Sequence, residues 1–520
     1  MYSPDDFSEF SDGKLWNALT DTDGLEKCFV LRELGSRAFS RRDYADAVSF
    51  AIQAAAIAEE IEDHRLAAAS RIDQGSANYH AGEKFEAIEA YKLGLDQFRI
   101  LGDQIEMADT LCRIADAEFD LKNYEECLTQ ATSAHEFGLA EDNWWIIAYS
   151  AYFQGKANYH LDKDEQALEN LETSREFFRK RADLEKVAMV DDFAASIHSY
   201  LGNYETAVNL LRSCVHIAEA TRDDEDNPYA LRRLGDALIR VRRYEEAQDY
   251  LERAQEQYRV RNFHRTYAFI ARDIADNLAY LGRVHESLSK FEQAQSLLDS
   301  LGEDHAVRYC KMRRSQLLHD HGDFQSAERL SRQVYVDVVA NEDFNDHSYI
   351  YWVGLHLADN LLELERYQDL LDLTAELDDS RAEPSPRNLV WKKTLRARAL
   401  YALDKDVEAL SEAESALALT TDESLNATTA YLYEIRAYVE LNNGKKSGER
   451  DLAHAIAIHL AAGADNEARE LADYFMPKLN PEEGLGLGMV DTELSAGEIE
   501  EGRDEDGDGP YKFGFQPGED

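Results

Sequence analysis

Small and apolar residues recur along this chain with a period of about 40 residues. Within one period, two further small positions follow the first, as Ala47 and Ala54 follow Gly35, and these two are seven positions apart. A spacing of seven places two side chains on one face of an α-helix, and these positions therefore predict a second helix in each period. The first track of small residues comprises Gly35, Gly75, Ala115, Gly155, Ala195, Gly235, Ala275 and Ser315.

The second track of small residues runs from Ala47 to Ala327, and an aromatic residue often precedes it by three positions, as at Tyr204 and Phe324. A glycine lies two positions before each of these two aromatics. This Gly-x-aromatic pattern predicts a corner at which one helix ends and the next begins. The whole chain contains only eight prolines, so few residues interrupt helices. Each period therefore predicts a helical hairpin, and the chain an all-α fold.

The order of a small residue, the Gly-x-aromatic corner and two small residues seven apart resembles the tetratricopeptide repeat over roughly residues 26 to 464. The usual period of that repeat is about 34 residues, so this chain is similar to the longer variants of kinesin light chains and Rap-type regulators. HEAT and armadillo arrays reach this period but lack the corner. The resemblance implies a right-handed α-solenoid of about ten or eleven hairpins, in which the first helix of each hairpin lines a groove.

The repeat pattern divides the chain into four regions. Residues 1–24 form an acidic N-terminal segment that we expect to be unanchored, and residues 25–343 hold eight regular repeats of the long period. Residues 344–476 hold irregular C-terminal repeats and a capping helix, because the register of small residues loosens there. Residues 477–520 contain 13 acidic and 3 basic residues with frequent glycine, which predicts a disordered acidic tail.

The charge and the cysteines exclude several classes of protein. The formal net charge is −47, which disfavours nucleic-acid binding. The five cysteines form no C-x-x-C pair, so neither a disulfide framework nor a zinc site is indicated. The first residues lack the basic start and apolar run of a signal peptide, and the longest aromatic-apolar stretch, Trp144 to Phe153, is too short to span a bilayer. We expect a soluble cytoplasmic protein with no membrane contact.

The predicted groove carries aromatic residues at matching positions of successive first helices, with arginines close to them. Between residues 232 and 272 there are ten arginines and six acidic residues, against the acidic average of the chain. Arginine forks and aromatic rings there predict a site for an acidic peptide. The alternative is that the rings pack between repeats and that each arginine pairs with an acid of the next repeat. The candidate binding residues are Tyr149, Tyr152, Phe153, Phe193, Tyr229, Arg232, Arg233, Phe269, Arg272 and Tyr309.

Motifs for catalysis, metals and cofactors are absent or incomplete. His319 and His321 point to opposite sides of a helix and fit one metal ion poorly. The run Gly484 to Gly488 lacks the strand that a dinucleotide loop needs, and Asp504 to Gly509 matches only the first half of a calcium loop. The Lys and Asn pair by which related chaperone-binding repeats hold a carboxylate is missing as well. We therefore expect no catalytic residue, metal or cofactor.

These features predict a non-enzymatic protein- or peptide-binding scaffold, because stacked hairpins form an extended concave surface. Two alternatives remain open. One is a regulator that acts catalytically on a bound partner, as the resemblance to Rap-type regulators allows. The other is an acidic decoy whose surface binds a basic, nucleic-acid-binding protein.

Overall fold

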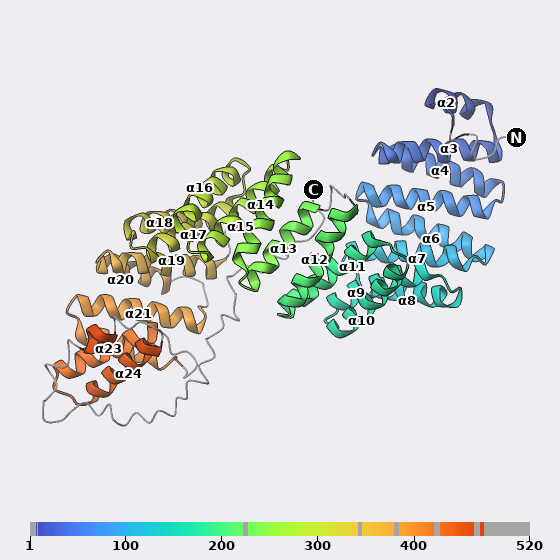
Figure 1. Ribbon diagram of the computed structural model, residues 1–520. Helices are drawn as coiled ribbons and strands as arrows, with labels where there is room; N and C mark the ends of the chain where they lie inside the picture. The colour runs from blue at the N-terminus through green and yellow to red at the C-terminus, as the bar shows by residue number, and fades with distance from the viewer. Residues whose placement is uncertain are drawn as a thin grey trace. The chain divides into compact units, whose positions relative to one another are not determined.

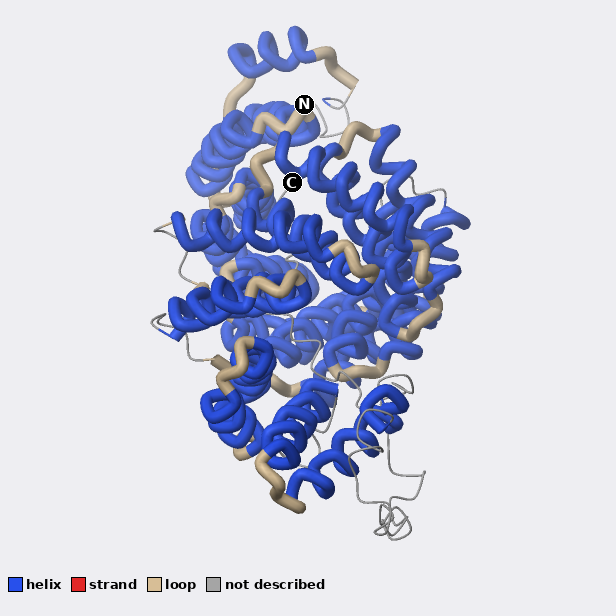
Figure 2. The backbone as a smooth tube through the Cα atoms, turned by 90° about the vertical axis from the view of Figure 1, so that its left-hand side faces the viewer, coloured by secondary structure: helices blue, strands red, loops and turns tan. Residues whose placement is uncertain are grey.

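The computed structural model describes residues 7, 9–221, 227–341, 346–378, 384–420, 427–461 and 468–472. These residues are helical or lie in the short loops between helices (Figure 2). The all-α prediction is confirmed for this part of the chain, which is an α-solenoid of eleven hairpins. The predicted acidic tail, with the Gly484 and Asp504 motifs, lies outside the described residues, as does most of the predicted capping helix.

The chain divides into two compact units, Met1–Phe263 and His264–Asp520. The first unit begins with helix α2 (Asp12–Asp21), and six hairpins follow it in chain order (Figure 1). They are α3 and α4 (Gly24–Ser40, Tyr44–Glu60), α5 and α6 (His64–Ala81, Lys84–Leu101), α7 and α8 (Gln104–Asp120, Tyr124–Ala140), α9 and α10 (Trp144–His160, Asp164–Lys180), α11 and α12 (Leu184–Tyr200, Tyr204–Thr221), and α13 and α14 (Asn227–Arg240, Tyr244–Val260).

The second unit contains five hairpins, and the second helix of each of the last three is shorter than the second helices of the first two. Its second helices α20 and α22 have 12 residues each, whereas α16 and α18 have 17. The hairpins are α15 and α16 (His264–Tyr280, Val284–Ser300), α17 and α18 (Asp304–Asp320, Phe324–Ala340), α19 and α20 (His347–Glu363, Tyr367–Asp378), α21 and α22 (Pro386–Ala402, Asp406–Leu417), and α23 and α24 (Ala427–Asn442, Ser447–Ala461).

The corner inside a hairpin has the form that the Gly-x-aromatic pattern predicts. Between α11 and α12, Gly202 has a φ of 76°, a left-handed conformation that costs glycine little. The Asn203 N–H donates to the His198 carbonyl at 2.8 Å, the long hydrogen bond of a Schellman motif. Tyr204 then begins α12. Arg42 takes the same left-handed conformation at the first corner, with a φ of 61°, so glycine is favoured there but not required.

The first helices of several hairpins start at an acidic or amide side chain that caps the helix. Each such side chain accepts a hydrogen bond from the backbone N–H three positions later, which satisfies one of the unpaired groups at a helix start. The caps recur once per repeat, at Asp63, Asp103, Asn143 and Asp183. Part of the acidic composition is therefore explained by helix capping.

The small-residue tracks lie where the two helices of a hairpin cross closely. A Cβ added to Gly155 would approach Leu171 on the next helix to 2.7 Å, and one added to Gly235 would approach Leu251 to the same distance. Ala167, in the second track, is fully buried. The small residues thus allow the close helix packing that their spacing predicts.

The described part of the N-terminal segment, residue 7 and residues 9–24, is anchored, whereas we expected residues 1–24 to be unanchored. Phe7 and Leu15 are fully buried in a cluster with residues of α3. Asp12 accepts hydrogen bonds from Arg37 at 2.8 Å and from Arg41 at 2.9 Å. The acidic composition did not predict these contacts. A few apolar side chains and one ion-paired carboxylate are enough to hold a short helix against the first hairpin.

Candidate functional site

The first helices of neighbouring hairpins contact one another in the first unit, as α3 does with α5, and α7 does with α9. Helices α5, α7 and α9 are the first helices of three successive hairpins, and the candidate site lies beside them.

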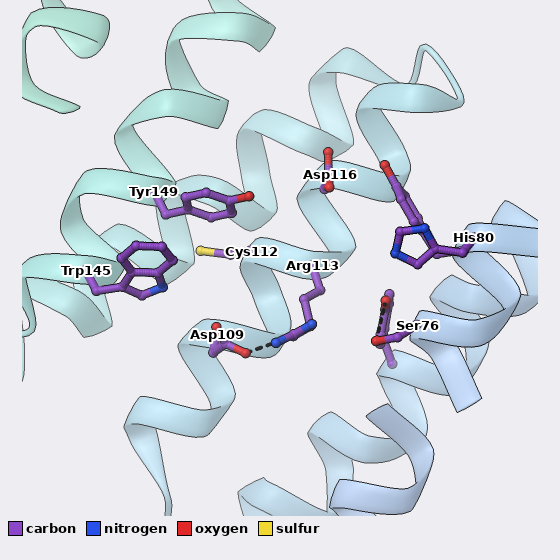
Figure 3. A pocket seen from close by; sticks show the side chains of 10 residues that line it. Ser76, His80, Asp109, Cys112, Arg113, Asp116, Trp145 and Tyr149 are labelled. Carbon is purple, nitrogen blue, oxygen red and sulfur yellow. Dashed lines mark hydrogen bonds and ion pairs between the residues drawn. The ribbon is translucent and has the colours of Figure 1, made fainter. Parts of the chain in front are cut away.

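A cavity of about 270 Å³ opens between these three helices, and α6 contributes Tyr91 to its lining (Figure 3). Helix α7 contributes four lining residues, and α5 and α9 face them from either side. The cavity is lined by Ser76, Tyr79, His80, Tyr91, Asp109, Cys112, Arg113, Asp116, Trp145 and Tyr149. Residues of α5 and α9, which belong to hairpins two repeats apart in the sequence, thus come together around one space.

One wall of the cavity is aromatic. The rings of Trp145 and Tyr149, one helical turn apart on α9, stack with centroids 5.3 Å apart and an angle of 12° between their planes. Burial raises the pKa of the Tyr149 hydroxyl to about 12, so this hydroxyl stays protonated at neutral pH. In Figure 3 the Tyr149 hydroxyl points away from α9 toward the space beside α7.

Asp109 and Arg113 form an ion pair across one turn of α7. The Arg113 Nε donates to Asp109 Oδ2 at 2.8 Å, and both side chains are at least a third exposed. An exposed pair of this kind contributes little stability, in the range of about 0–1 kcal/mol. The pair matters for the charge of the site. Arg113 is the only arginine or lysine among the lining residues, and it already has a carboxylate partner.

Asp116 lies one turn further along α7 and brings a second carboxylate to the cavity. Burial raises the pKa of this carboxyl group, while Lys156 and the Tyr79 hydroxyl act in the opposite direction. The Tyr79 hydroxyl donates to Asp120 at 2.7 Å, and Lys84 donates to the same Asp120 oxygen at 2.8 Å. Asp116 is therefore a partly buried carboxylate that shares the neighbouring Tyr79 hydroxyl with Asp120.

The surroundings of Cys112 do not make its thiol reactive. Its side chain is buried, and burial raises the pKa of the thiol far above its ordinary value. A thiol that remains protonated is a poor nucleophile. All five cysteines are free and buried. Among the described residues, no group of three His, Cys, Asp or Glu side chains could hold a metal ion.

The first four residues predicted from the sequence lie mainly in the core. Phe153 is 1 % exposed and Tyr152 is 8 % exposed, and both belong to a cluster with residues of α10 and α11. Phe193 contacts Tyr152 edge to face, with centroids 6.3 Å apart. Of the ten predicted residues, Tyr149 alone lines the cavity.

Tyr229, Arg232 and Arg233 lie together on α13, in the first unit. Arg233 forms an ion pair with Asp192 of the preceding hairpin at 2.8 Å and donates to the Tyr229 hydroxyl at 3.2 Å. It also donates to Ser196 at 2.9 Å. The Arg233 guanidinium is thus held by groups of its own chain, as the alternative interpretation predicts.

Phe269, Arg272 and Tyr309 come together in the second unit. The Arg272 guanidinium lies over both rings, 5.2 Å from the Phe269 centroid and 5.3 Å from the Tyr309 centroid. It also pairs with Asp273 at 2.6 Å. The structure therefore brings these three residues together, with an acidic partner in place.

His319 and His321 have separate partners. The His319 ring bonds the Asn360 side chain at 2.9 Å, and the His321 ring bonds the Leu317 carbonyl at 2.9 Å. The structure gives the two rings different environments.

The sequence interpretation missed most of the cavity. Asp109 and Tyr149 belong to one row of positions that recurs once per repeat, and Cys112 belongs to the neighbouring row. The first half of these rows, up to Tyr149, therefore contained residues of the cavity, but the prediction concentrated on the arginine-rich second half. Tyr79 and His80 stand out in the sequence only because the tetrapeptide Ala77-Asn78-Tyr79-His80 recurs two repeats later as Ala157-Asn158-Tyr159-His160.

Within the part of the chain that the structure describes, none of the helices is both long and apolar enough to cross a membrane.

Comparison with known proteins identifies the repeat. Residues 186–260, which cover most of α11 to α14, match the tetratricopeptide repeat family. A comparison with curated protein sequences finds no significant match.

Similar folds occur among solved structures. The apo form of RapI is 16 % identical, with a TM-score of 0.40 over 51 % of this chain and 95 % of that one. The apo quorum sensor NprR from B. thuringiensis is 12 % identical, with a TM-score of 0.45 over 62 % and 90 % of the two chains. Aspartyl phosphate phosphatase F from Bacillus subtilis is 13 % identical, with a TM-score of 0.39 over 71 % and 94 %. The family match of residues 186–260 shows that this chain contains tetratricopeptide repeats, in a row of hairpins with the same two-helix layout.

Proposed function

We propose that this protein is a non-enzymatic scaffold that binds a peptide or an extended protein segment along the first helices of its hairpins. The observation that carries the proposal is the cavity between α5, α7 and α9, where aromatic and polar side chains of these helices and of α6 converge. Convergence of a few polar groups on a partly apolar cavity is typical of a ligand site. Free, buried cysteines suit a reducing compartment, and we place the scaffold in the cytoplasm.

The chemistry of the lining favours binding over catalysis. The Cys112 thiol and the Tyr149 hydroxyl both have raised pKa values, so neither supplies a nucleophile or base at neutral pH. The Arg113 and Asp109 side chains neutralise each other. Such groups orient a ligand by hydrogen bonds and contact, and they leave it chemically unchanged.

The test is a selection of random dodecapeptides by display against the immobilised full chain. We expect selected peptides to bind the wild type and to lose affinity by about tenfold or more to Ser76→Phe, because the new ring fills the cavity. Ser49→Phe is the matched control, since Ser49 is exposed on α4. Equal binding of all peptides to the wild type and to Ser76→Phe would contradict the proposal.

The arginine and aromatic residues predicted from the sequence, around Arg232 in the first unit and around Arg272 in the second, are further candidates for contact with an acidic peptide. The position of Arg272 over two rings favours the second of these candidates, because the stacking fixes the guanidinium at the surface of α15. Arg232→Glu with Arg272→Glu should abolish binding of an acidic peptide selected against the full chain. Retained wild-type affinity in this double variant would exclude these arginines from the binding surface.

A further inference from the structure

We infer that the cavity between α5, α7 and α9 receives a cationic side chain of the ligand, a lysine or an arginine of a bound peptide. The inference rests on the proposed function and specifies the chemistry of its ligand. Three observations lead to it: the surplus of oxygen atoms in the lining, the position of the Asp116 carboxylate in that lining, and the charge of the chain.

Oxygen acceptors predominate among the polar groups of the cavity. Asp109 and Asp116 contribute carboxylates, and Ser76, Tyr79, Tyr91 and Tyr149 contribute hydroxyls. The one arginine of the lining, Arg113, pairs with Asp109 at 2.8 Å. Within the lining, the Asp116 carboxylate has no arginine or lysine partner after this pair is formed, and Lys156 acts on it from outside the lining. An ammonium or guanidinium group, which only donates hydrogen bonds, complements such a surface.

The Asp116 carboxylate lines the cavity, and Lys156 and the Tyr79 hydroxyl are among the groups of the chain that act on it. A phenol has a single proton to donate, and Tyr79 donates it to Asp120 at 2.7 Å. The nearby Lys156 ammonium lies over the Phe119 ring, 3.8 Å from its centroid. In Figure 3, Asp116 lies at the edge of the space between Tyr149 and His80. A ligand cation would gain a charge-assisted hydrogen bond in surroundings that are partly shielded from water.

The size and walls of the cavity suit one long basic side chain. The volume of about 270 Å³ is roughly nine times the share of a water molecule in the liquid. The stacked rings of Trp145 and Tyr149 offer an apolar wall for the methylene stem of a lysine or an arginine. No group of three potential ligands for a metal ion occurs among the described residues, so we assign the cation to an organic side chain.

The whole chain attracts the same kind of ligand. Its formal net charge of −47 raises the local concentration of basic peptides and speeds their encounter with the surface. This long-range attraction has no preference for one position, whereas the cavity would select a single basic side chain of the bound segment. An experiment must therefore separate general attraction from specific recognition at Asp116.

The experiment compares paired synthetic peptides taken from the random dodecapeptide selection against the full chain. In each peptide, one lysine at a time is replaced by norleucine, or one arginine by citrulline, which keeps the length and removes the charge. We expect one such replacement per peptide to reduce the affinity for the wild type by about tenfold or more. This measurement requires no protein variant and so does not depend on how a variant folds.

The protein variants assign the effect to Asp116. Asp116→Asn should weaken the charged peptide by about tenfold, and it should bind the charged and neutral peptides equally. Asp96→Asn is the matched control with the same change of net charge, because Asp96 is exposed on the second helix α6. At physiological salt, this control should change the affinity by less than about twofold. Circular dichroism of each variant verifies the fold.

Different failures have different meanings. Some selected peptides could bind Ser76→Phe more weakly than the wild type and yet contain no basic residue that binding requires. Such peptides would overturn the inference of a cationic ligand and leave the proposed function intact. Basic peptides that bind Asp116→Asn as tightly as the wild type would also overturn it, since general attraction would then explain their binding. A selection that yields no peptide dependent on the cavity would contradict the proposed function and, with it, this inference.

Discussion

Glycines at equivalent positions of the first small-residue track have different surroundings, and substitutions should separate them. A Cβ added to Gly75 would lie 2.4 Å from the Tyr91 ring, whereas one added to Gly35 would meet its nearest atom, on Phe50, at 3.5 Å. We expect Gly75→Ala to lower the free energy of unfolding by about 1–3 kcal/mol through overpacking. Gly35→Ala should be neutral or stabilising by up to about 1 kcal/mol, because alanine favours helix. Urea unfolding measures both, and a stabilised Gly75→Ala would contradict the packing argument.

His356, in the second unit, should make stability depend on pH. Its ring lies edge-on to Trp352 and Trp391, with centroids 4.4 and 4.8 Å away. Burial, His319 and Arg313 lower its pKa to about 3, while the unfolded chain has a histidine pKa of about 6.5. Between these values the unfolded state binds the extra proton. The stabilising contribution of neutral His356 is therefore complete above about pH 6.5 and is lost as the pH falls toward 3.

His356→Gln isolates this contribution. We expect the stability of the wild type to fall more steeply than that of the variant below about pH 6.5, by up to about 1.4 kcal/mol per pH unit. The carboxylates titrate in both proteins, so the difference between the two curves reports His356. Urea unfolding at several pH values, followed by tryptophan fluorescence, provides the curves. Parallel curves would show that the folded protein binds a proton at His356 as readily as the unfolded chain does.

At the scale of single residues, the sequence predicts packing better than the site. The small tracks follow from one physical requirement, close helix approach, which acts at every repeat. Asp116 depends instead on the side chains that surround it: Tyr79 from the hairpin before and Lys156 from the hairpin after. Such partners are one repeat apart in sequence, and the periodic pattern does not say how far each side chain reaches.

At the scale of helices, ion pairs connect neighbouring hairpins at separations close to the repeat period. An arginine of one hairpin reaches an acid of the next or the previous one, which supports the alternative interpretation of the arginine-rich stretch. These pairs are Arg32 with Asp73, Arg65 with Asp103, Arg233 with Asp192, Arg265 with Glu303, Arg313 with Asp276, and Arg366 with Glu328. Most of them are partly exposed, so each contributes modestly to stability.

One pair between helices is buried and should contribute more. Arg175 on α10 lies 2.5 Å from Asp191 on α11, and the Asp191 side chain is fully buried. Arg175→Met leaves this carboxylate without its cation, and we expect a loss of about 3 kcal/mol or more in the free energy of unfolding. The combined variant Arg175→Met with Asp191→Leu should recover most of the loss, because it removes the buried charge. Urea unfolding compares the two, and a double variant as unstable as the single one would contradict the argument.

The hairpins themselves could be predicted from the sequence because two local signals coincide. The Gly-x-aromatic corner fixes where one helix ends, and the spacing of seven positions fixes the inward face of the next. Helix α2 lacked both signals, so its anchoring by Leu15 and by the pairs of Asp12 was missed. The shorter second helices α20 and α22 lie where the small-residue register loosens.

At the scale of the whole molecule, the formal net charge of −47 should make stability increase with ionic strength. Repulsion among excess carboxylates opposes the compact state, and salt screens this repulsion within a Debye length of about 8–10 Å at physiological concentrations. Salt also weakens the ion pairs between hairpins, but exposed pairs contribute only about 0–1 kcal/mol each. We expect the repulsion to dominate, because the excess of acids is distributed over the chain.

Thermal unfolding in sodium chloride tests this balance. Between about 0.01 and 0.3 M salt, the melting temperature should rise by about 2–4 °C, which corresponds to about 1 kcal/mol for a unit of this size. Potassium chloride is the control, since screening depends on ionic strength and both salts should then give the same rise. A melting temperature that falls with salt would mean that attraction between the charges of neighbouring hairpins outweighs the repulsion. The acidic surface would then stabilise the stack through its arginine pairs, and the large net charge would serve the attraction of a basic ligand without opposing the fold.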